Sequence, residues 1–144
     1  GISAVQAWAA KAGAPLGHDF CAISLSDLLT PWSVIEKRIK AATESDFVIA
    51  LYNPASGRRR NQLVKTIEII KQGRGPQTPV IIGRSLGRPE EKLEIMDIQD
   101  FEPDSVDMLS IVIVGSTQTK TFRGRVFTPR GYLIPPPPNE SHPK

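Results

Sequence analysis

The chain has 144 residues, of which 40% are hydrophobic and 23% charged, and its formal net charge is +3. This composition is typical of one globular domain and excludes a disordered or collagen-like chain. The single cysteine excludes an intramolecular disulfide, and no apolar run reaches the roughly 18 residues of a membrane-spanning helix. We therefore expect a cytoplasmic protein, without a metal site because no cysteine and histidine have the spacing of metal ligands.

Helical and extended patterns alternate along the chain. Ser3 is a predicted N-cap and Gly13 ends the first helix, while Thr30 and Pro31 predict the start of the second. The predicted elements, in chain order, are a helix at 3–12, a strand at 19–26, a helix at 30–43, a strand at 46–52, a helix at 57–72, and strands at 78–85, 92–98 and 109–115. Residues 100–108 are expected to form a loop or a helical turn.

This order predicts an α/β fold with a mixed, largely parallel sheet that is flanked by helices on both faces. Residues 1–128 are the predicted domain, and the proline-rich residues 129–144 are a predicted tail or linker. Ligands of such sheets bind beyond the carboxyl ends of the strands. We therefore expect the loops after Leu51, Ile82 and Val114 to lie on one functional edge.

Three consecutive arginines, Arg58, Arg59 and Arg60, stand where the helix at 57–72 begins. A cation at a helix N-terminus costs about 0.3–1 kcal/mol, because the helix dipole is positive there. The arginines could pair with acids on the surface, or they could bind a carboxylate or phosphate group of a ligand. Basic residues dominate 58–74 and acidic residues dominate 88–104, which favours a local anion site over a nucleic-acid surface.

Other motifs are ambiguous, and no set of residues forms a self-sufficient catalytic group. Gly87 in the stretch GRSLGR, and Gly115 with Ser116 after the last predicted strand, fit either ordinary turns or sites of close ligand approach. The chain also begins at Gly1 and enters a helix almost at once. We therefore expect a piece of a longer protein whose active site requires another domain.

Four stretches of the chain together resemble one protein family. They are GISA at 1–4, APLGHDFCAISLSDLLTPW at 14–32, DFVIALYNPASGRRR at 46–60 and VDMLSIVIVGST at 106–117. They are similar to the C-terminal half of the tetrapyrrole methylases of corrinoid biosynthesis, over about residues 1–128. The stretches SLSDLLTPW and YNPASGRRR resemble in particular the members that methylate carbon 17 of precorrin-3B, rather than those that act at carbon 11 or 20.

The resemblance implies a two-domain fold with S-adenosylmethionine and the tetrapyrrole in the cleft between the domains. The N-terminal domain would then be missing from this chain, which would be inactive alone, and the full-length protein would be a homodimer. The residues that match cofactor-binding positions of the family are Ser3, Ala4, Tyr52, Asn53, Gly87, Gly115 and Ser116.

The implied reaction is methyl transfer to a ring carbon of precorrin-3B, or of its cobalt-containing counterpart, linked to ring contraction in cobalamin biosynthesis. The acetate and propionate carboxylates of such a substrate are the anions that Arg58, Arg59 and Arg60 would bind. Ring contraction needs a proton donor or acceptor, and Asp27 in SLSDLLTPW is the candidate. The sequence leaves open whether cobalt is already in the substrate.

Two alternatives differ from this interpretation. The first is another corrinoid methylase of the same family that acts at a different carbon, which the position of the added methyl group would reveal. The second is a non-catalytic α/β module that binds anions or nucleic acid, and it predicts nucleic-acid binding with a steep salt dependence. The methylase interpretation predicts no binding to nucleic acid or to a membrane.

Overall fold

The computed structural model describes residues 1–55 and 60–131, and its centre is a five-stranded sheet. In spatial order the strands are β2 (Phe20–Ser24), β3 (Val48–Tyr52), β6 (Ser110–Val114), β4 (Pro79–Arg84) and β5 (Lys92–Asp97). The apolar runs of the three central strands, β3, β6 and β4, suit a sheet that is buried on both faces there. A mixed α/β fold is therefore confirmed.

The directions of the strands correct one part of the prediction. Among the neighbouring pairs of this sheet, only β2 and β3 are parallel; β6 is antiparallel to both of its neighbours, β3 and β4, and β5 is antiparallel to β4. The sheet is therefore mixed, but the expectation that it is largely parallel is wrong. The short turn at 85–91 returns the chain directly from β4 to β5, and such a turn joins only antiparallel strands.

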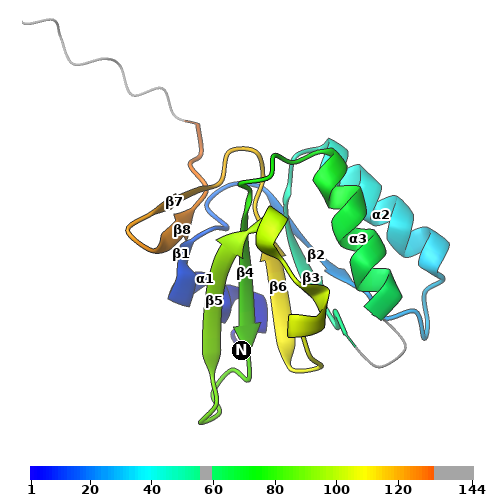
Figure 1. Ribbon diagram of the computed structural model, residues 1–144, viewed down its shortest axis with the longest axis horizontal. Coiled ribbons are helices and arrows are strands. Elements are labelled where there is room, and N and C mark those ends of the chain that lie inside the picture. The colour runs from blue at the N-terminus through cyan, green and yellow to red at the C-terminus, as the bar shows by residue number, and fades with distance from the viewer. Residues whose placement is uncertain (56–59, 132–144) are drawn as a thin grey trace, which may run out of the picture.

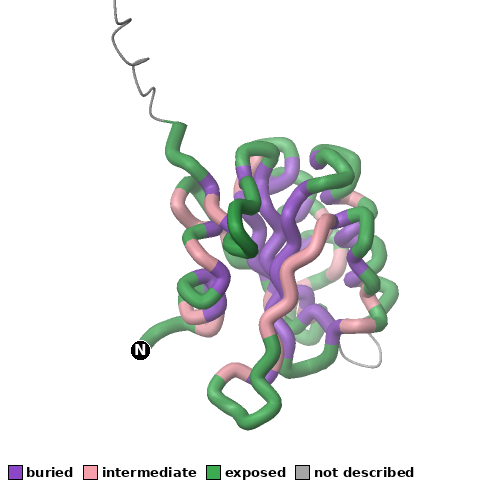
Figure 2. The backbone as a smooth tube through the Cα atoms, turned by 60° about the vertical axis from the view of Figure 1, so that its left-hand side comes forward, coloured by how far each residue is buried: buried purple, intermediate pink, exposed green. Residues whose placement is uncertain are grey.

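Helices cover both faces of the sheet, as Figure 1 shows. On one face, α1 (Ala4–Ala12) packs Val5 and Trp8 against strand residues such as Ile81. On the other face, α2 (Trp32–Glu44) and α3 (Arg60–Gln72) form a second core with Ile39 and Ile67. Alternate residues of each central strand enter opposite cores, which explains why the buried backbone runs through the middle of the domain in Figure 2.

The sequence signals at the helix ends are partly confirmed. The Ser3 hydroxyl accepts a hydrogen bond from the Gln6 backbone N–H at 3.2 Å, and Gly13 ends α1 with a φ of 136°. The predicted Thr30 cap is wrong, because α2 begins at Trp32 after Pro31 and no side chain caps it.

Short elements complete the described part of the chain. The expected helical turns within 100–108 include η2 (Pro103–Ser105), which follows η1 (Ile98–Asp100). The sequence analysis missed a three-stranded sheet of β1 (Gly13–Ala14), β8 (Arg125–Phe127) and β7 (Lys120–Phe122). Nearly all of the predicted tail lies outside the described residues and stays a prediction. In the described ranges, no helix combines the length and the apolar character needed to cross a membrane.

The sheet has two ends with different loops. We call the end that holds Tyr52, Arg84 and Ser110 the lower end, following the view in Figure 1, and the end that holds Val114 the upper end. The N-terminus of the chain lies at the level of the lower end in both Figures 1 and 2. The loop after β6 and the three-stranded sheet lie toward the upper end.

Candidate functional site

The end of β3 is tied to the loop after β2. Asn53 adopts a φ of 50°, and its side-chain Nδ2 donates a hydrogen bond to Ser24 Oγ at 3.0 Å. The Leu25 backbone N–H donates to the Tyr52 carbonyl at 2.9 Å, so both segments leave the sheet together. Asparagine tolerates the left-handed conformation better than most residues, which is why this turn can expose the backbone at the strand end.

The turn after β4 is stabilised by Glu91 and Lys11. Gly87, with a φ of 74°, donates its backbone N–H to Glu91 Oε1 at 2.9 Å, and Lys11 in α1 contacts Glu91 Oε2 at the same distance. These hydrogen bonds, the one from Gly87 first, lower the pKa of the Glu91 carboxyl. A Cβ atom at Gly87 would meet nothing within 4 Å, so this predicted cofactor residue faces open space.

The lowered pKa of Glu91 predicts a pH-dependent stability. The Glu91 carboxylate stabilises the folded chain above its ordinary pKa of 4.5, and this stabilisation is lost as the pH falls through the lower, folded value. We therefore expect Glu91→Gln to lower the urea midpoint of unfolding at neutral pH, with the difference from wild type disappearing below pH 4.5. Glu90→Gln, at the exposed neighbouring position, is the control that should show little change. A difference that is constant with pH would contradict the prediction.

Two further cofactor candidates lie near the start of α1. The Ser3 side chain is exposed apart from its capping hydrogen bond, and Ala4 is half-buried against the core beneath α1. Because the N-terminus lies at the level of the lower end, the fold brings Ser3 and Ala4 to the same end as Tyr52, Asn53 and Gly87.

Gly115 and Ser116 lie at the upper end instead, because β6 runs antiparallel to β3 and β4. The expectation that the loops after Leu51, Ile82 and Val114 share one edge is therefore wrong for the third loop. Ser116 is buried, and its backbone N–H donates to Thr119 Oγ1 at 2.8 Å, so it forms part of a closed turn.

The residues that the reversed strand brings to the lower end are Met108 and Leu109. Their exposed fractions are 74% and 47%, and the Leu109 carbonyl accepts a hydrogen bond from the Ser85 backbone N–H at 3.1 Å. The sequence analysis missed them. The available signal was a pair of apolar residues before a buried strand in VDMLSIVIVG, which has meaning only once the strand direction is known.

Polar side chains of the predicted substrate and catalytic sites also lie toward the lower end. Gln62 in the first turn of α3 donates from Nε2 to Asp27 Oδ2 at 2.8 Å. Arg60 Nη1 lies 3.0 Å from Asp104 Oδ1 of η2, so this arginine pairs with a surface acid. Arg58 and Arg59 lie outside the described residues, and their predicted roles stay predictions.

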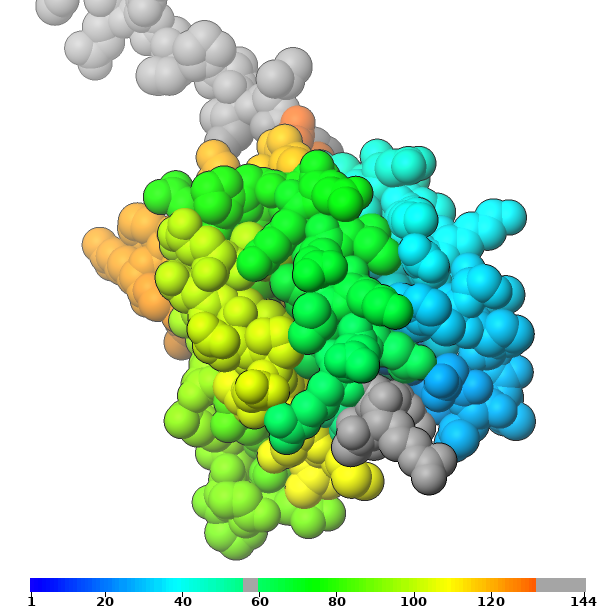
Figure 3. Space-filling model, turned by 45° about the vertical axis from the view of Figure 1, so that its right-hand side comes forward, coloured from blue at the N-terminus to red at the C-terminus, as the bar shows by residue number. Residues whose placement is uncertain are grey.

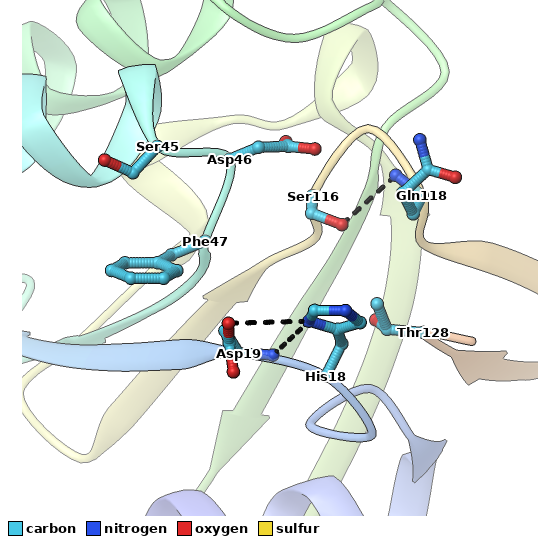
Figure 4. A pocket seen from close by; sticks show the side chains of 8 residues that line it. All are labelled: His18, Asp19, Ser45, Asp46, Phe47, Ser116, Gln118 and Thr128. Carbon is cyan, nitrogen blue, oxygen red and sulfur yellow. Dashed lines mark hydrogen bonds and ion pairs between the residues drawn. The ribbon is translucent and has the colours of Figure 1, made fainter. Parts of the chain in front are cut away.

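The upper end carries a pocket of about 250 Å³ that Figure 4 shows from close by. Several of its polar groups bond to near neighbours in the chain: His18 Nδ1 accepts the Asp19 backbone N–H at 2.7 Å, and Ser116 Oγ accepts that of Gln118 at 3.1 Å. Asp46 Oδ1 accepts a hydrogen bond from the backbone N–H of the adjoining Thr117 at 2.8 Å. The Asp46 contact joins two loops. Ser116 lines the pocket, but the residues at the lower end that are predicted to bind the cofactor lie away from it.

These features define a mixed α/β domain. Its exposed strand-end loops and exposed apolar residues lie at the lower end, and its closed turns lie at the upper end. The chain matches the family of tetrapyrrole (corrin/porphyrin) methylases over residues 1–102, and it belongs to that family.

Individual relatives agree with this assignment. The chain is 48% identical, over 93% of its length, to a probable cobalt-factor III C(17)-methyltransferase of Salmonella typhimurium, of which it covers 56%. It is 46% identical, over 92% of its length, to a precorrin-3B C(17)-methyltransferase of a Sinorhizobium species, of which it covers 54%. The crystal structure of the methyltransferase CobJ matches 90% of this chain at 41% identity with a TM-score of 0.85, and 54% of that chain is covered. The chain thus spans about half the length of these relatives.

Proposed function

We propose that this chain is the C-terminal half of an S-adenosylmethionine-dependent methyltransferase that methylates carbon 17 of precorrin-3B or cobalt-factor III, with ring contraction, in cobalamin biosynthesis. The observation that carries the proposal is the identity of 48% and 46% to relatives named for that reaction, over nearly the whole chain. This chain covers only 56% and 54% of the same relatives, which supports a missing domain. From the resemblance we also propose a cytoplasmic homodimer for the full-length protein.

The lower end offers the kinds of groups that would bind part of S-adenosylmethionine. Adenine needs apolar surfaces for its faces and main-chain groups for its polar edge, and ligand sites generally combine the two. Met108 and Leu109 supply exposed apolar surface, and the turns at Asn53 and Gly87 bring the main chain to the surface. When bound, S-adenosylmethionine would supply an electrophilic methyl group.

The proposed cofactor residues of this chain are therefore those at the lower end. They are Ser3, Ala4, Tyr52, Asn53, Gly87, Met108 and Leu109. We do not extend the proposal to Gly115 and Ser116, because β6 separates Gly115 from Leu109 by roughly 20 Å at 3.4 Å per residue. Contacts to one adenosine from both ends of the strand would require a different fold of this segment.

The residues of this domain would act mainly by positioning. Methyl transfer to carbon needs alignment of the two reactants and exclusion of water, and each can lower the barrier by several kcal/mol. The exposed apolar residues at the lower end would exclude water only after the missing domain covers them. A substrate that gains a methyl cation equivalent at a ring carbon must release one proton to restore its charge, and the Asp27 carboxylate, fixed by Gln62, is the proposed acceptor.

The arginines at the start of α3 would hold the carboxylates of the substrate. Arg60 is 60% exposed and lies at the lower end of α3, where an anion also meets the positive end of the helix dipole. Arg58 and Arg59 precede it directly in the sequence and are proposed for the same role.

The test is a methyl-transfer assay on the full-length protein, or on residues 1–144 joined to the N-terminal half of the Salmonella typhimurium relative. We expect a labelled methyl group to pass from S-adenosylmethionine to precorrin-3B or cobalt-factor III, with nuclear magnetic resonance placing it on carbon 17. The chain alone should show no transfer. Methylation at another carbon would favour another corrinoid methylase, and salt-dependent binding to nucleic acid without transfer would favour a non-catalytic module.

A further inference from the structure

The contact between Arg60 and Asp104 joins the most basic and the most acidic parts of the chain. Arg60 is the first residue of α3, and Asp104 lies in η2, with Nη1 and Oδ1 3.0 Å apart. Figure 3 shows the segment that contains η1 and η2 lying against α3 on the same face. The charge asymmetry of the sequence is thus partly compensated within the domain.

The turn that carries Asp104 is held rigidly. Pro103 opens it, and the Ser105 side-chain hydroxyl and backbone N–H both donate to the Glu102 carbonyl, at 2.6 and 2.9 Å. Val106 follows as a buried residue that anchors the turn to the core. Asp104 therefore meets Arg60 from a fixed position, so the contact belongs to the folded domain.

This ion pair is easily exchanged for another. The Arg60 side chain is 60% exposed and that of Asp104 is 82% exposed, and exposed pairs contribute little because water and salt screen them. Arg74 provides the contrast within the same domain, because its side chain is fully buried and donates to several carbonyl groups. Unlike Arg74, Arg60 can therefore change its partner without disrupting the core.

We infer that the Asp104 carboxylate pairs with Arg60 in the free protein. When the tetrapyrrole substrate binds, one of its carboxylates displaces Asp104 from Arg60. The inference rests on the proposed function, because it requires that Arg60 binds the substrate. Substrate binding must then break the Arg60–Asp104 pair, and the free energy of this pair is subtracted from the affinity. Asp104 thereby weakens substrate binding and leaves cofactor binding unaffected.

The test is the KM for precorrin-3B of the full-length protein and its variants. Asp104→Asn keeps the shape of the side chain and removes its charge, and we expect a KM about two- to fivefold lower than wild type, with kcat and the Kd for S-adenosylmethionine unchanged. Glu102→Gln is the matched control. Glu102 is an exposed acid next to the same turn, and it does not pair with Arg60. Its substitution removes the same charge and should leave the KM unchanged.

A double-mutant cycle shows whether Asp104 acts through Arg60. Arg60→Ala should raise the KM, and adding Asp104→Asn to it should have no further effect. An unchanged or higher KM in Asp104→Asn alone would overturn the inference, as would an equal decrease in the Arg60→Ala background or in Glu102→Gln. Absence of methyl transfer by the wild-type full-length protein would instead contradict the proposed function, and with it the role of Asp104.

Discussion

Arg74→Met is expected to lower the free energy of unfolding by about 3–5 kcal/mol, because it leaves a set of buried polar groups without their partner. The Arg74 side chain has no exposed surface. It donates to the carbonyl oxygens of Gly115, Thr43 and Phe47 at 3.0, 2.9 and 2.7 Å. One side chain thus joins the end of α2, the start of β3 and the end of β6.

The charge of Arg74 is held in place by a nearby carboxylate. Burial lowers the pKa of the guanidinium group, and the Asp46 carboxylate, whose Oδ1 lies 3.4 Å away, opposes this change. Arg74→Lys should therefore also be destabilising, since an ammonium group cannot reach three separated carbonyls as the planar guanidinium does.

Urea unfolding followed by circular dichroism measures both effects. Lys71→Met, which replaces an exposed basic residue near the same end of α3, is the control and should change the free energy of unfolding by less than about 0.5 kcal/mol. A loss below about 1 kcal/mol in Arg74→Met would show that the carbonyl groups find other partners.

The second large effect is expected for Gly83→Ala. Gly83 lies in β4 directly under the Trp8 ring of α1, and a Cβ atom at this position would overlap atoms of the indole. Trp8 is only 1% exposed and packs in the core, so neither group can move freely. Overpacking of this kind costs typically about 1–3 kcal/mol, and the rigid indole ring places this site near the upper value.

Gly75→Ala is the matched control for this substitution. A Cβ atom at Gly75 would meet nothing within 4 Å, and this glycine is exposed. We expect a lower thermal midpoint for Gly83→Ala and little change for Gly75→Ala. Equal midpoints would mean that α1 shifts along the sheet at no cost.

The Gly83–Trp8 contact also bears on the proposed cofactor site. It sets how closely α1 approaches the sheet, and α1 carries Ser3 and Ala4 at its start. In the full-length protein, Gly83→Ala should therefore raise the KM for S-adenosylmethionine in addition to reducing stability. An unchanged KM would mean that the position of α1 does not affect cofactor binding.

Local structure could be predicted well from the sequence, because its signals act over a few residues. The runs VIAL in β3 and IVIV in β6 are apolar throughout, so burial on both faces follows without knowledge of their neighbours. Ser3 and Gly13 mark the ends of α1 by hydrogen bonding and by φ, which are also local properties. The three-stranded sheet was missed because its strands have two or three residues and show no periodicity.

The sequence by itself thus determined the three helices, the strands of the five-stranded sheet, the two-faced burial of its centre and the resemblance to a family. Only the tertiary structure decided the direction of β6, because an apolar strand has the same pattern when read either way. That direction places Gly115 and Ser116 at the upper end and Met108 and Leu109 at the lower end. The partner of Arg60 was likewise undetermined, since Asp104 is 44 residues away and meets it only after η2 packs against α3.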